Sequence, residues 1–256
     1  MLDGAVSESR YARHHILPEI GKTGQDRLGA ARVLVVGAGG LGAPVLLYLA
    51  AAGVGHIGIA DDDVVSLSNL QRQVLHSTSW LDQPKTYSAL ERLHDLNPGI
   101  DIATYPFRVG EAQAASLVHR YDLVIDCTDN LDGRYVLNRA CVKARVPLLS
   151  GAISGWEGQI GLYDPVHGGP CFACVFPEVQ KQRPIQTKGV VGALPGVVGA
   201  TMALNAIKHI AGAGASLRGK LMLFDTLWNE QSVLNVARDG TCPVCGDIHF
   251  REKREC

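Results

Sequence analysis

The chain of 256 residues carries almost no net charge, because 24 Lys and Arg residues are balanced by 25 Asp and Glu residues. Proteins that hold nucleic acid through its phosphates need a basic excess, so the composition argues against a nucleic-acid partner. No apolar run reaches the roughly 20 residues of a membrane-spanning helix. The weakly apolar stretch 190–215 is interrupted by Pro195 and carries Lys208 and His209, which indicates a buried helix with its lead-in. We therefore expect no contact with a membrane.

The first residues also lack the apolar core of a secretory signal, since residues 1–13 are polar and charged. No internal repeat, low-complexity tract or long linker divides the chain. With 46% apolar and 19% charged residues, the composition is that of a globular protein. We expect a cytoplasmic protein with a single domain over residues 1–256. Its nucleotide-binding half would cover about 30–150, and its second half about 151–256.

A glycine-rich run follows an apolar segment. Residues 32–36 are rich in valine, which is typical of a buried parallel strand. After them Gly37, Gly39 and Gly42 have the spacing G-x-G-x-x-G, and residues 41–52 read as a helix. Glycine permits the tight turn and a close approach to a phosphate, while the helix directs free N–H groups at the anion. The run predicts a nucleotide-binding loop, with a structural turn as the alternative.

A second strand, over residues 57–60, ends at Asp61 and Asp63. Asp61 lies about 20 residues after the glycines, where a carboxylate can bind ribose hydroxyls. Strands and helices then alternate, which predicts an α/β fold with a doubly wound, Rossmann-like, mostly parallel sheet. The further elements expected are strands at 100–107, 122–126 and 147–150 and helices at 86–96, 111–120 and 132–144. An antiparallel C-terminal extension is expected from residues 158–163, 220–224 and 232–236.

The strand that ends at Asp126 is followed by Thr128, Asp129 and Asn130. Ligands bind outside the carboxyl ends of strands in such sheets, and a carboxylate such as Asp129 is suited to hold Mg²⁺ on a triphosphate. The same three residues are all good N-caps for the helix that follows. The sequence alone leaves these two interpretations open.

Three cations are further candidates, against the ordinary alternative of a solvated surface charge. Arg72 lies in the dense polar run 68–73, whose groups need polar partners such as a phosphate chain. Lys85 could place an ammonium on the α-phosphate during nucleotidyl transfer. Arg13 means little alone, but it could act as an arginine finger if the N-terminal helix, residues 7–17, reaches a neighbouring subunit.

Four of the seven cysteines form two C-x-x-C pairs. In a cytosolic protein such pairs indicate a metal ion rather than disulfides, and four thiolates suit tetrahedral Zn²⁺. The predicted structural zinc knuckle would join the C-terminal segment to the middle of the chain. A redox dithiol and unrelated buried cysteines are the alternatives. The pairs are Cys171 with Cys174 and Cys242 with Cys245. Cys127 and Cys141 lie in apolar segments and are expected to be inert core thiols, whereas Cys256 is expected to be exposed.

Together these motifs resemble the ThiF/MoeB/HesA family, the bacterial relatives of ubiquitin-activating enzymes. The resemblance spans nearly the whole chain, and its motifs occur in the same order. They are residues 10–18 (RYARHHILP), the loop 37–42, residues 61–73, 83–85 and 126–130, the two C-x-x-C pairs and residues 189–199. The acidic run 61–63 and residues 189–192 look slightly closer to the thiamine-pathway member than to the molybdopterin member.

Members of this family use ATP and Mg²⁺ to adenylate the C-terminal Gly-Gly carboxylate of a ubiquitin-like sulfur-carrier protein. A separate donor then supplies sulfur for a thiocarboxylate. The resemblance implies this activity here, a homodimer, and a carrier-binding role for the second half. In the nucleotide site, the resemblance implies that Gly39 and Gly40 face the phosphates and that Asp61 contacts the ribose. Asn69, Arg72 and Lys85 would contact the phosphate chain, and Asp129 would bind Mg²⁺. The four paired cysteines would bind Zn²⁺, and Arg13 would make a contact across the dimer. The nucleotide site is expected to include Gly37, Gly42, Asp63 and Asn130 as well, with Arg13, Arg72, Lys85 and Asp129 as its catalytic group.

One position departs from the family pattern. Many members carry a cysteine in a loop shortly before the Gly-Val segment, but Ile185 stands at that place, and no cysteine lies between Cys174 and Cys242. We therefore expect adenylation without a covalent link between carrier and enzyme at this loop, with sulfur transfer left to another protein.

Three other functions remain alternatives at this stage. The glycine loop and Asp61 alone would allow a nicotinamide-dependent oxidoreductase, which leaves Arg72, Lys85, Asp129 and the cysteine pairs without a role. Relatives within the superfamily adenylate a peptide carboxylate or a carboxyl group on a modified tRNA base. A scaffold that binds the carrier without activating it is the third. The sequence names neither the carrier nor the pathway.

Overall fold

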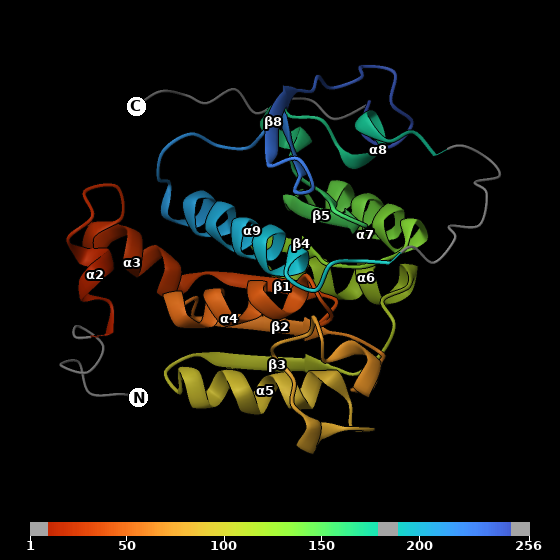
Figure 1. The fold of residues 1–256 in the computed structure, drawn as a ribbon. Coiled ribbons are helices and arrows are strands. Elements are labelled where there is room, and N and C mark those ends of the chain that lie inside the picture. Colours follow the sequence, from red (N-terminus) through yellow and green to blue (C-terminus); the bar gives the residue numbers. More distant parts are fainter. Residues whose placement is uncertain (1–9, 179–188, 247–256) are drawn as a thin grey trace.

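The computed structural model describes residues 10–178 and 189–246. They form an eight-stranded sheet in the order β3-β2-β1-β4-β5-β6-β7-β8, shown in Figure 1. The strands are β1 (Arg32–Val36), β2 (His56–Ala60), β3 (Asp101–Tyr105), β4 (Leu123–Asp126), β5 (Leu148–Ser154), β6 (Glu157–Tyr163), β7 (Lys220–Asp225) and β8 (Glu230–Asn235). The first five are parallel, and the last three continue the sheet antiparallel. The predicted doubly wound sheet with an antiparallel extension is confirmed.

Helices cover both faces of the parallel part of the sheet (Figure 1). One layer contains α3 (Gly21–Ala30), α4 (Gly42–Ala52), α5 (Lys85–Leu96) and α9 (Leu194–Ala211), and the other contains α6 (Glu111–Leu117) and α7 (Leu131–Ala144). The short helices are α2 (Ala12–His15) and α8 (Phe172–Val175), with 3-10 turns η1 (Leu67–Asn69), η2 (Thr78–Trp80), η3 (Val118–Arg120) and η4 (Pro165–His167). Within the described residues, no helix is both long and apolar enough to cross a membrane.

The side chains of β1 divide between two hydrophobic clusters. Val33 and Val35 pack with the α4 and α9 layer, whereas Leu34 and Val36 pack with the α6 and α7 layer. Successive side chains of a strand point to opposite faces of a sheet, so a strand covered by helices on both sides must be apolar throughout. This is the physical reason why the run at residues 32–36 predicted a buried parallel strand correctly.

Helix α9 lies directly against α4. A Cβ atom at Gly199 would come within 2.4 Å of Pro44 Cγ and 2.6 Å of the Leu41 carbonyl oxygen, so glycine permits this close approach. Both helices begin next to the glycine loop, since Pro195 Cβ lies 3.3 Å from where a Gly40 Cβ would be. The positive ends of two helix dipoles therefore meet at that loop. The buried helix expected within 190–215 is α9.

The N-terminal helix and strand β5 differ in length from the sequence-based prediction. Within the described residues of the helix predicted at 7–17, Arg10 is helical, Tyr11 is in a turn and α2 covers Ala12–His15. Strand β5 continues to Ser154 instead of ending at residue 150, because its last residues pair with β6, as in the register Ser154↔Glu157. Ser150 pairs with Asp126, the last residue of β4, so β5 rises four residues, or about 13 Å, above the carboxyl end of β4.

Candidate nucleotide and metal sites

The glycine loop follows β1 at the point where the order of the parallel strands reverses, between β1 and β4. Gly37 has φ +98°, and a Cβ atom there would lie 2.8 Å from the Cys127 carbonyl oxygen. A Cβ atom at Gly42 would lie 1.9 Å from the Gly37 carbonyl oxygen. Both positions therefore require glycine, and they bring the loop after β1 against the loop after β4, where ligands bind in folds of this class.

The backbone of the loop offers unused donors. Among the described residues, the N–H groups of Gly39, Gly40 and Leu41 have no hydrogen-bond acceptor. They lie at the N-terminus of α4, where an anion is stabilised both by free N–H groups and by the helix dipole. This arrangement fits the phosphate role predicted for Gly39 and Gly40.

Asp61, the residue after β2, holds the loop. Its Oδ2 accepts the Ala38 N–H at 2.7 Å, and its Oδ1 accepts the Asp63 N–H at 2.8 Å. Burial raises the pKa of the Asp61 carboxyl above its usual value, although the nearby charge of Lys85 and the two N–H donors oppose the shift. Each carboxylate oxygen retains a second lone pair, so contact with a ribose remains compatible with these bonds and stays a prediction.

Lys85 is the first residue of α5, and its Nζ lies 2.7 Å from Asp63 Oδ2. The lysine side chain is only 4% exposed, whereas Asp63 is 69% exposed. The ion pair therefore holds the buried Lys85 side chain beside the acidic residues that follow β2. The structure brings Asp61, Asp63 and Lys85 together as the sequence predicted.

Asn69, Arg72 and Gln73 form a network beside the loop. Asn69 Oδ1 accepts hydrogen bonds from Arg72 Nη2 at 3.1 Å and from Gln73 Nε2 at 2.8 Å. Because a guanidinium only donates, this contact fixes the orientation of both amides. Gln73, which is 4% exposed, then keeps a buried Oε1 with no partner in the described structure. The Gln73 side chain lies next to Gly39, with Nε2 3.4 Å from where a Gly39 Cβ would be, and its unpaired Oε1 fits a site whose ligand supplies a donor.

The loop after β4 decides between the two interpretations of Asp129. Asn130 is the N-cap of α7, since its side chain accepts the Gly133 N–H at 2.8 Å. Asp126 is fully buried and accepts from Thr128 N at 2.9 Å and from Ser150 Oγ at 2.6 Å. Asp129 is left exposed and does not cap the helix. Its carboxylate is therefore available as a Mg²⁺ ligand.

Arg13 lies far from the glycine loop of its own chain. The neighbouring Tyr11 contacts Gly53 at the end of α4, and its hydroxyl accepts from Asn97 Nδ2 at 2.8 Å at the end of α5. Both helices start at the loop end of the sheet, and the 11 residues of α4 span about 16 Å. The exposed Arg13 is consequently at the opposite edge of the sheet from the glycine loop of its own chain, and its predicted action in a partner subunit stays a prediction.

The four paired cysteines come together as predicted. Their sulfur atoms lie within 4.8 Å of one another. Zn–S bonds of 2.3 Å place the sulfurs of a tetrahedral site about 3.8 Å apart. The observed distances are 3.7 Å for Cys171–Cys242, 3.8 Å for Cys171–Cys174 and 3.4 Å for Cys174–Cys245. This arrangement fits a Zn²⁺ ion. It also places the cysteines of the C-terminal segment against α8.

The other cysteines of the described residues are buried. Burial raises the pKa of both the Cys127 and the Cys141 thiol, which agrees with the expectation of inert core thiols. Cys256 and Ile185 lie outside the described residues.

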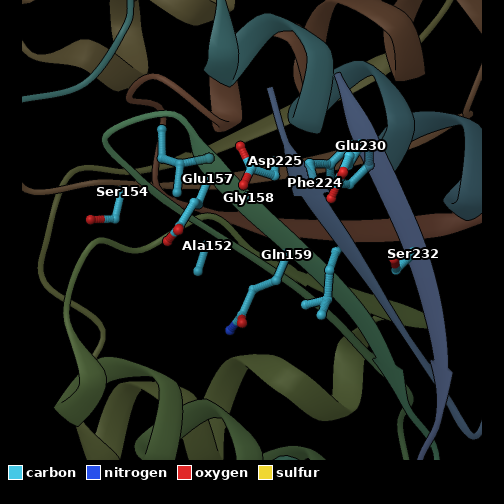
Figure 2. Close-up of a pocket in the computed structure, with 11 residues that line it drawn as sticks. Ala152, Ser154, Glu157, Gly158, Gln159, Phe224, Asp225, Glu230 and Ser232 are labelled. Atoms are coloured by element: carbon cyan, nitrogen blue, oxygen red, sulfur yellow. The ribbon is translucent and has the colours of Figure 1, made fainter. Parts of the chain in front are cut away.

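A cavity of about 560 Å³ lies over β5 to β8. Figure 2 shows Glu157, Asp225 and Glu230 among its lining residues. Glu157 pairs with Asp225 in the register of β6 and β7, and Asp225 pairs with Glu230 in that of β7 and β8. Side chains directly opposite on paired strands share one face, so these three carboxylates form an acidic row across the sheet.

Sequence reasoning missed three neighbours of the loop: Gln73, His76 and Pro195. Gln73 lies inside the polar run that was singled out, but nothing distinguished it from Gln71. Pro195 was noted only as an interruption of the apolar stretch 190–215, and no local pattern placed it beside Gly40. His76 hydrogen-bonds to Ala38, 38 residues away along the chain, a contact that neither periodicity nor spacing indicates.

Comparison with known proteins is consistent across sequence and structure. The model of the ThiF family matches residues 11–244. The chain is 45% identical to the sulfur carrier protein adenylyltransferase of Thermus thermophilus, over 93% of this chain and 90% of that protein. It is 45% identical to the adenylyltransferase and sulfurtransferase MOCS3 of Bos taurus, covering 93% of this chain but 53% of that protein. It is 42% identical to the SAMP-activating enzyme E1 of Haloferax volcanii, over 95% and 90%.

Among solved structures, the crystal structure of E. coli MccB with ATP superposes with a TM-score of 0.83. The match covers 95% of this chain and 76% of that one at 24% identity, which supports the fold.

Proposed function

We propose, on the premise that this chain belongs to the ThiF family, that it is an ATP-dependent adenylyltransferase acting on the C-terminal glycine carboxylate of a ubiquitin-like sulfur carrier. The observation that carries this proposal is the convergence of free loop N–H groups, the buried Lys85 cation and the exposed Asp129 carboxylate at one edge of the sheet. The name of the Thermus relative, which the chain matches over nearly its whole length, supports the carrier as substrate.

Each residue of this edge then has a task in binding MgATP. The N–H groups of Gly39 and Gly40 hold phosphate oxygens, and Asp61 accepts from ribose hydroxyls. Arg72 and the remaining N–H of Asn69 contact the phosphate chain, and Lys85 contacts the α-phosphate. Asp129 would hold Mg²⁺, and the ion would supply charge neutralisation on the triphosphate.

The chemical step needs no side-chain nucleophile. A carboxylate oxygen of the carrier forms a bond to the α-phosphorus, while the bond from that phosphorus to the bridging oxygen breaks and pyrophosphate leaves with the electron pair. No proton is transferred. Catalysis is therefore positioning together with stabilisation of the negative charge that shifts to the leaving group.

The antiparallel extension is the proposed docking surface for the carrier. The acidic row of Glu157, Asp225 and Glu230 has no ion-pair partner among the described residues, and like charges on directly opposed residues repel. At the nearby turns, Trp156 and Trp228 are 46% and 72% exposed. A carrier with basic and apolar side chains around the root of its tail matches this surface. About four extended residues of tail cover the ~13 Å by which β5 overhangs β4.

Reversing the acidic row should weaken carrier binding selectively. For the double variant Glu157→Lys/Glu230→Lys we expect the KM for the carrier to rise about 10-fold, because the attraction that steers the carrier becomes repulsion. The dissociation constant of MgATP should not change. Glu91→Lys/Asp95→Lys places the same charges on exposed positions of α5 and should leave both constants unaltered. Equal effects of the two double variants would point to net charge alone and contradict docking on this face.

A homodimer is proposed through the outer side of α4 and α9. Tyr48, Val197 and Leu204 are 55%, 48% and 56% exposed on these helices, and an apolar face of this kind is typical of an interface. If two copies pack with these helices antiparallel about a two-fold axis, α2 of one copy comes to the loop end of the other. Arg13, which cannot serve its own site, would then reach the partner's nucleotide.

A mixing experiment tests the action of Arg13 in trans. Arg13→Ala and Asp129→Ala should each be nearly inactive as homodimers. After equal mixing and subunit exchange, half of the dimers are mixed, and one of their two sites carries both Arg13 and Asp129. Activity should therefore recover to about a quarter of the wild-type value. If the proteins exchange subunits and no activity returns, Arg13 does not act across the dimer.

The four cysteines are proposed to bind one structural Zn²⁺ ion, and the sulfur donor is proposed to be a separate protein. The buried thiols Cys127 and Cys141 are unsuited to a covalent link with the carrier. The acyl adenylate of the carrier would thus be the product of this protein.

The deciding experiment is to mix the protein with MgATP and candidate carriers that end in Gly-Gly, and to measure the intact mass of each carrier. A carrier heavier by one AMP, with release of pyrophosphate, is the expected result. No mass change with any carrier, despite measured ATP binding, would contradict the carrier as substrate and leave a peptide or tRNA carboxylate, or a binding scaffold. Binding of NAD in preference to ATP would favour the alternative function of a nicotinamide-dependent oxidoreductase.

A further inference from the structure

His76 is buried beside the nucleotide loop without a role in the chemistry described above. It is 7% exposed, and its two ring nitrogens contact two different elements. Nε2 lies 2.8 Å from the Ala38 carbonyl oxygen, and Nδ1 lies 2.9 Å from Ser88 Oγ on α5. Both partners are far away in sequence, so only the folded chain brings this set together.

The roles of the two nitrogens follow from their partners. A carbonyl oxygen can only accept, so Nε2 must carry a proton and donate it to Ala38. In the neutral ring Nδ1 is then the acceptor for the Ser88 hydroxyl. Burial and the charge of the nearby Lys85 both lower the pKa of His76, and they thereby favour this neutral form.

The bond to Ala38 fixes the direction of a donor that the nucleotide needs. The Ala38 carbonyl and the Gly39 N–H belong to one planar trans peptide, so they point in opposite directions. His76 Nε2 is the partner of that carbonyl in the described structure, because the first helix bond of α4 comes from Ala43 N to the Gly39 oxygen, not to Ala38. While His76 holds the carbonyl, the Gly39 N–H remains turned away from the histidine with no protein acceptor of its own.

The peptide before Ala38 is held in the same way, because its N–H donates to Asp61 Oδ2 at 2.7 Å. The flexible glycine loop is therefore clamped on both sides of Ala38 by side chains, Asp61 after β2 and His76 before α5. Ser88 lies one turn after Lys85 on α5. One helix therefore carries both the lysine proposed to contact the α-phosphate and the hydroxyl that orients His76.

We propose that His76 is a positioning residue for ATP: it locks the Ala38–Gly39 peptide so that the Gly39 N–H is presented to a phosphate oxygen. The proposal rests on the proposed function only for the identity of the nucleotide. His76 itself touches neither substrate, and it acts through the backbone of the loop.

The test compares His76→Leu, which removes the donor, with His76→Gln, which keeps an N–H donor at a similar reach. For His76→Leu we expect the dissociation constant of MgATP to rise about 10-fold and kcat for adenylation to fall, with no change in the KM for the carrier. His76→Gln should recover most of both losses. Ser88→Ala leaves the Nε2 donor in place and should give a smaller effect of the same sign.

Melting temperature and zinc content of each variant serve as controls for folding. If His76→Leu folds and binds MgATP as the wild type does, or if His76→Gln is impaired as strongly as His76→Leu, the proposal is wrong. Should His76→Leu fail to fold, Ser88→Ala and His76→Gln are compared with the wild type instead. Unchanged MgATP affinity in Ser88→Ala together with a loss of MgATP affinity in His76→Gln would overturn the proposal. MgATP binding is measured by calorimetry without a carrier, so this outcome is separate from whether any carrier is adenylated.

Discussion

Replacing Lys85 by methionine is expected to lower kcat/KM for adenylation about 10³-fold, the size of effect seen when one charge-stabilising group is removed from a closed site. Only 4% of the Lys85 side chain is exposed to solvent. Its interaction with a phosphate is therefore weakly screened. Methionine keeps the unbranched stem that packs at the start of α5, so the loss isolates the charge. The measurement is the rate of pyrophosphate release at several carrier and ATP concentrations.

The fold should tolerate this change, because the partner left behind, Asp63, is 69% exposed and can be solvated. Arg139→Met is the matched control. Arg139 also loses an ion pair, with Glu111 at 2.6 Å, but it lies two turns into α7 and is 39% exposed. Its removal should leave kcat/KM unaltered. A Lys85→Met variant with nearly wild-type kcat/KM would remove the ammonium from the proposed mechanism.

Loss of the zinc centre is expected to have the largest effect on stability. The wild-type protein should contain one Zn²⁺ per chain and Cys242→Ser none. The metal closes a loop between Cys171 and Cys242, which are 71 residues apart, and loop closure of that length is worth about 4 kcal/mol in the chain-entropy treatment of cross-links. At 2–4 °C per kcal/mol for a domain of this size, the melting temperature should fall by about 10 °C. Calorimetry and metal analysis measure both quantities.

The site chemistry should survive this change at low temperature, because the cysteines pack with Val142, Ala173 and Val244 in a cluster of their own, separate from the cluster that contains Ala38 and Leu41 of the glycine loop. Cys256→Ser removes a thiol that is not part of the four-cysteine group and should retain both zinc and melting temperature. A wild-type protein with no zinc, or a Cys242→Ser variant as stable as the wild type, would show that the four thiols do not form a structural metal site.

The parts of this protein that the sequence determined are those fixed by residue type and short spacing. The valine-rich run at 32–36 predicted a buried strand, and residues 33–36 are buried. Gly37 and Gly42 were identifiable by their spacing, and the structure gives the reason, because a Cβ atom at either position would collide with backbone. The two C-x-x-C pairs predicted a four-thiol group because four thiolates at that spacing suit one metal ion, and the structure brings the four sulfur atoms together. In each case the chemistry acts within a few residues of the chain.

The tertiary structure decided what depends on distant partners. It made Asn130 the N-cap of α7, whereas Asp129 does not cap the helix, although local propensity ranks Asp and Asn alike. It carried Arg13 to the far edge of the sheet, a location that α4 and α5 set by their length. It brought His76 to Ala38 across 38 residues. Such contacts form because packing of helices on a sheet selects them, and no periodicity in a single sequence encodes which side chains will meet.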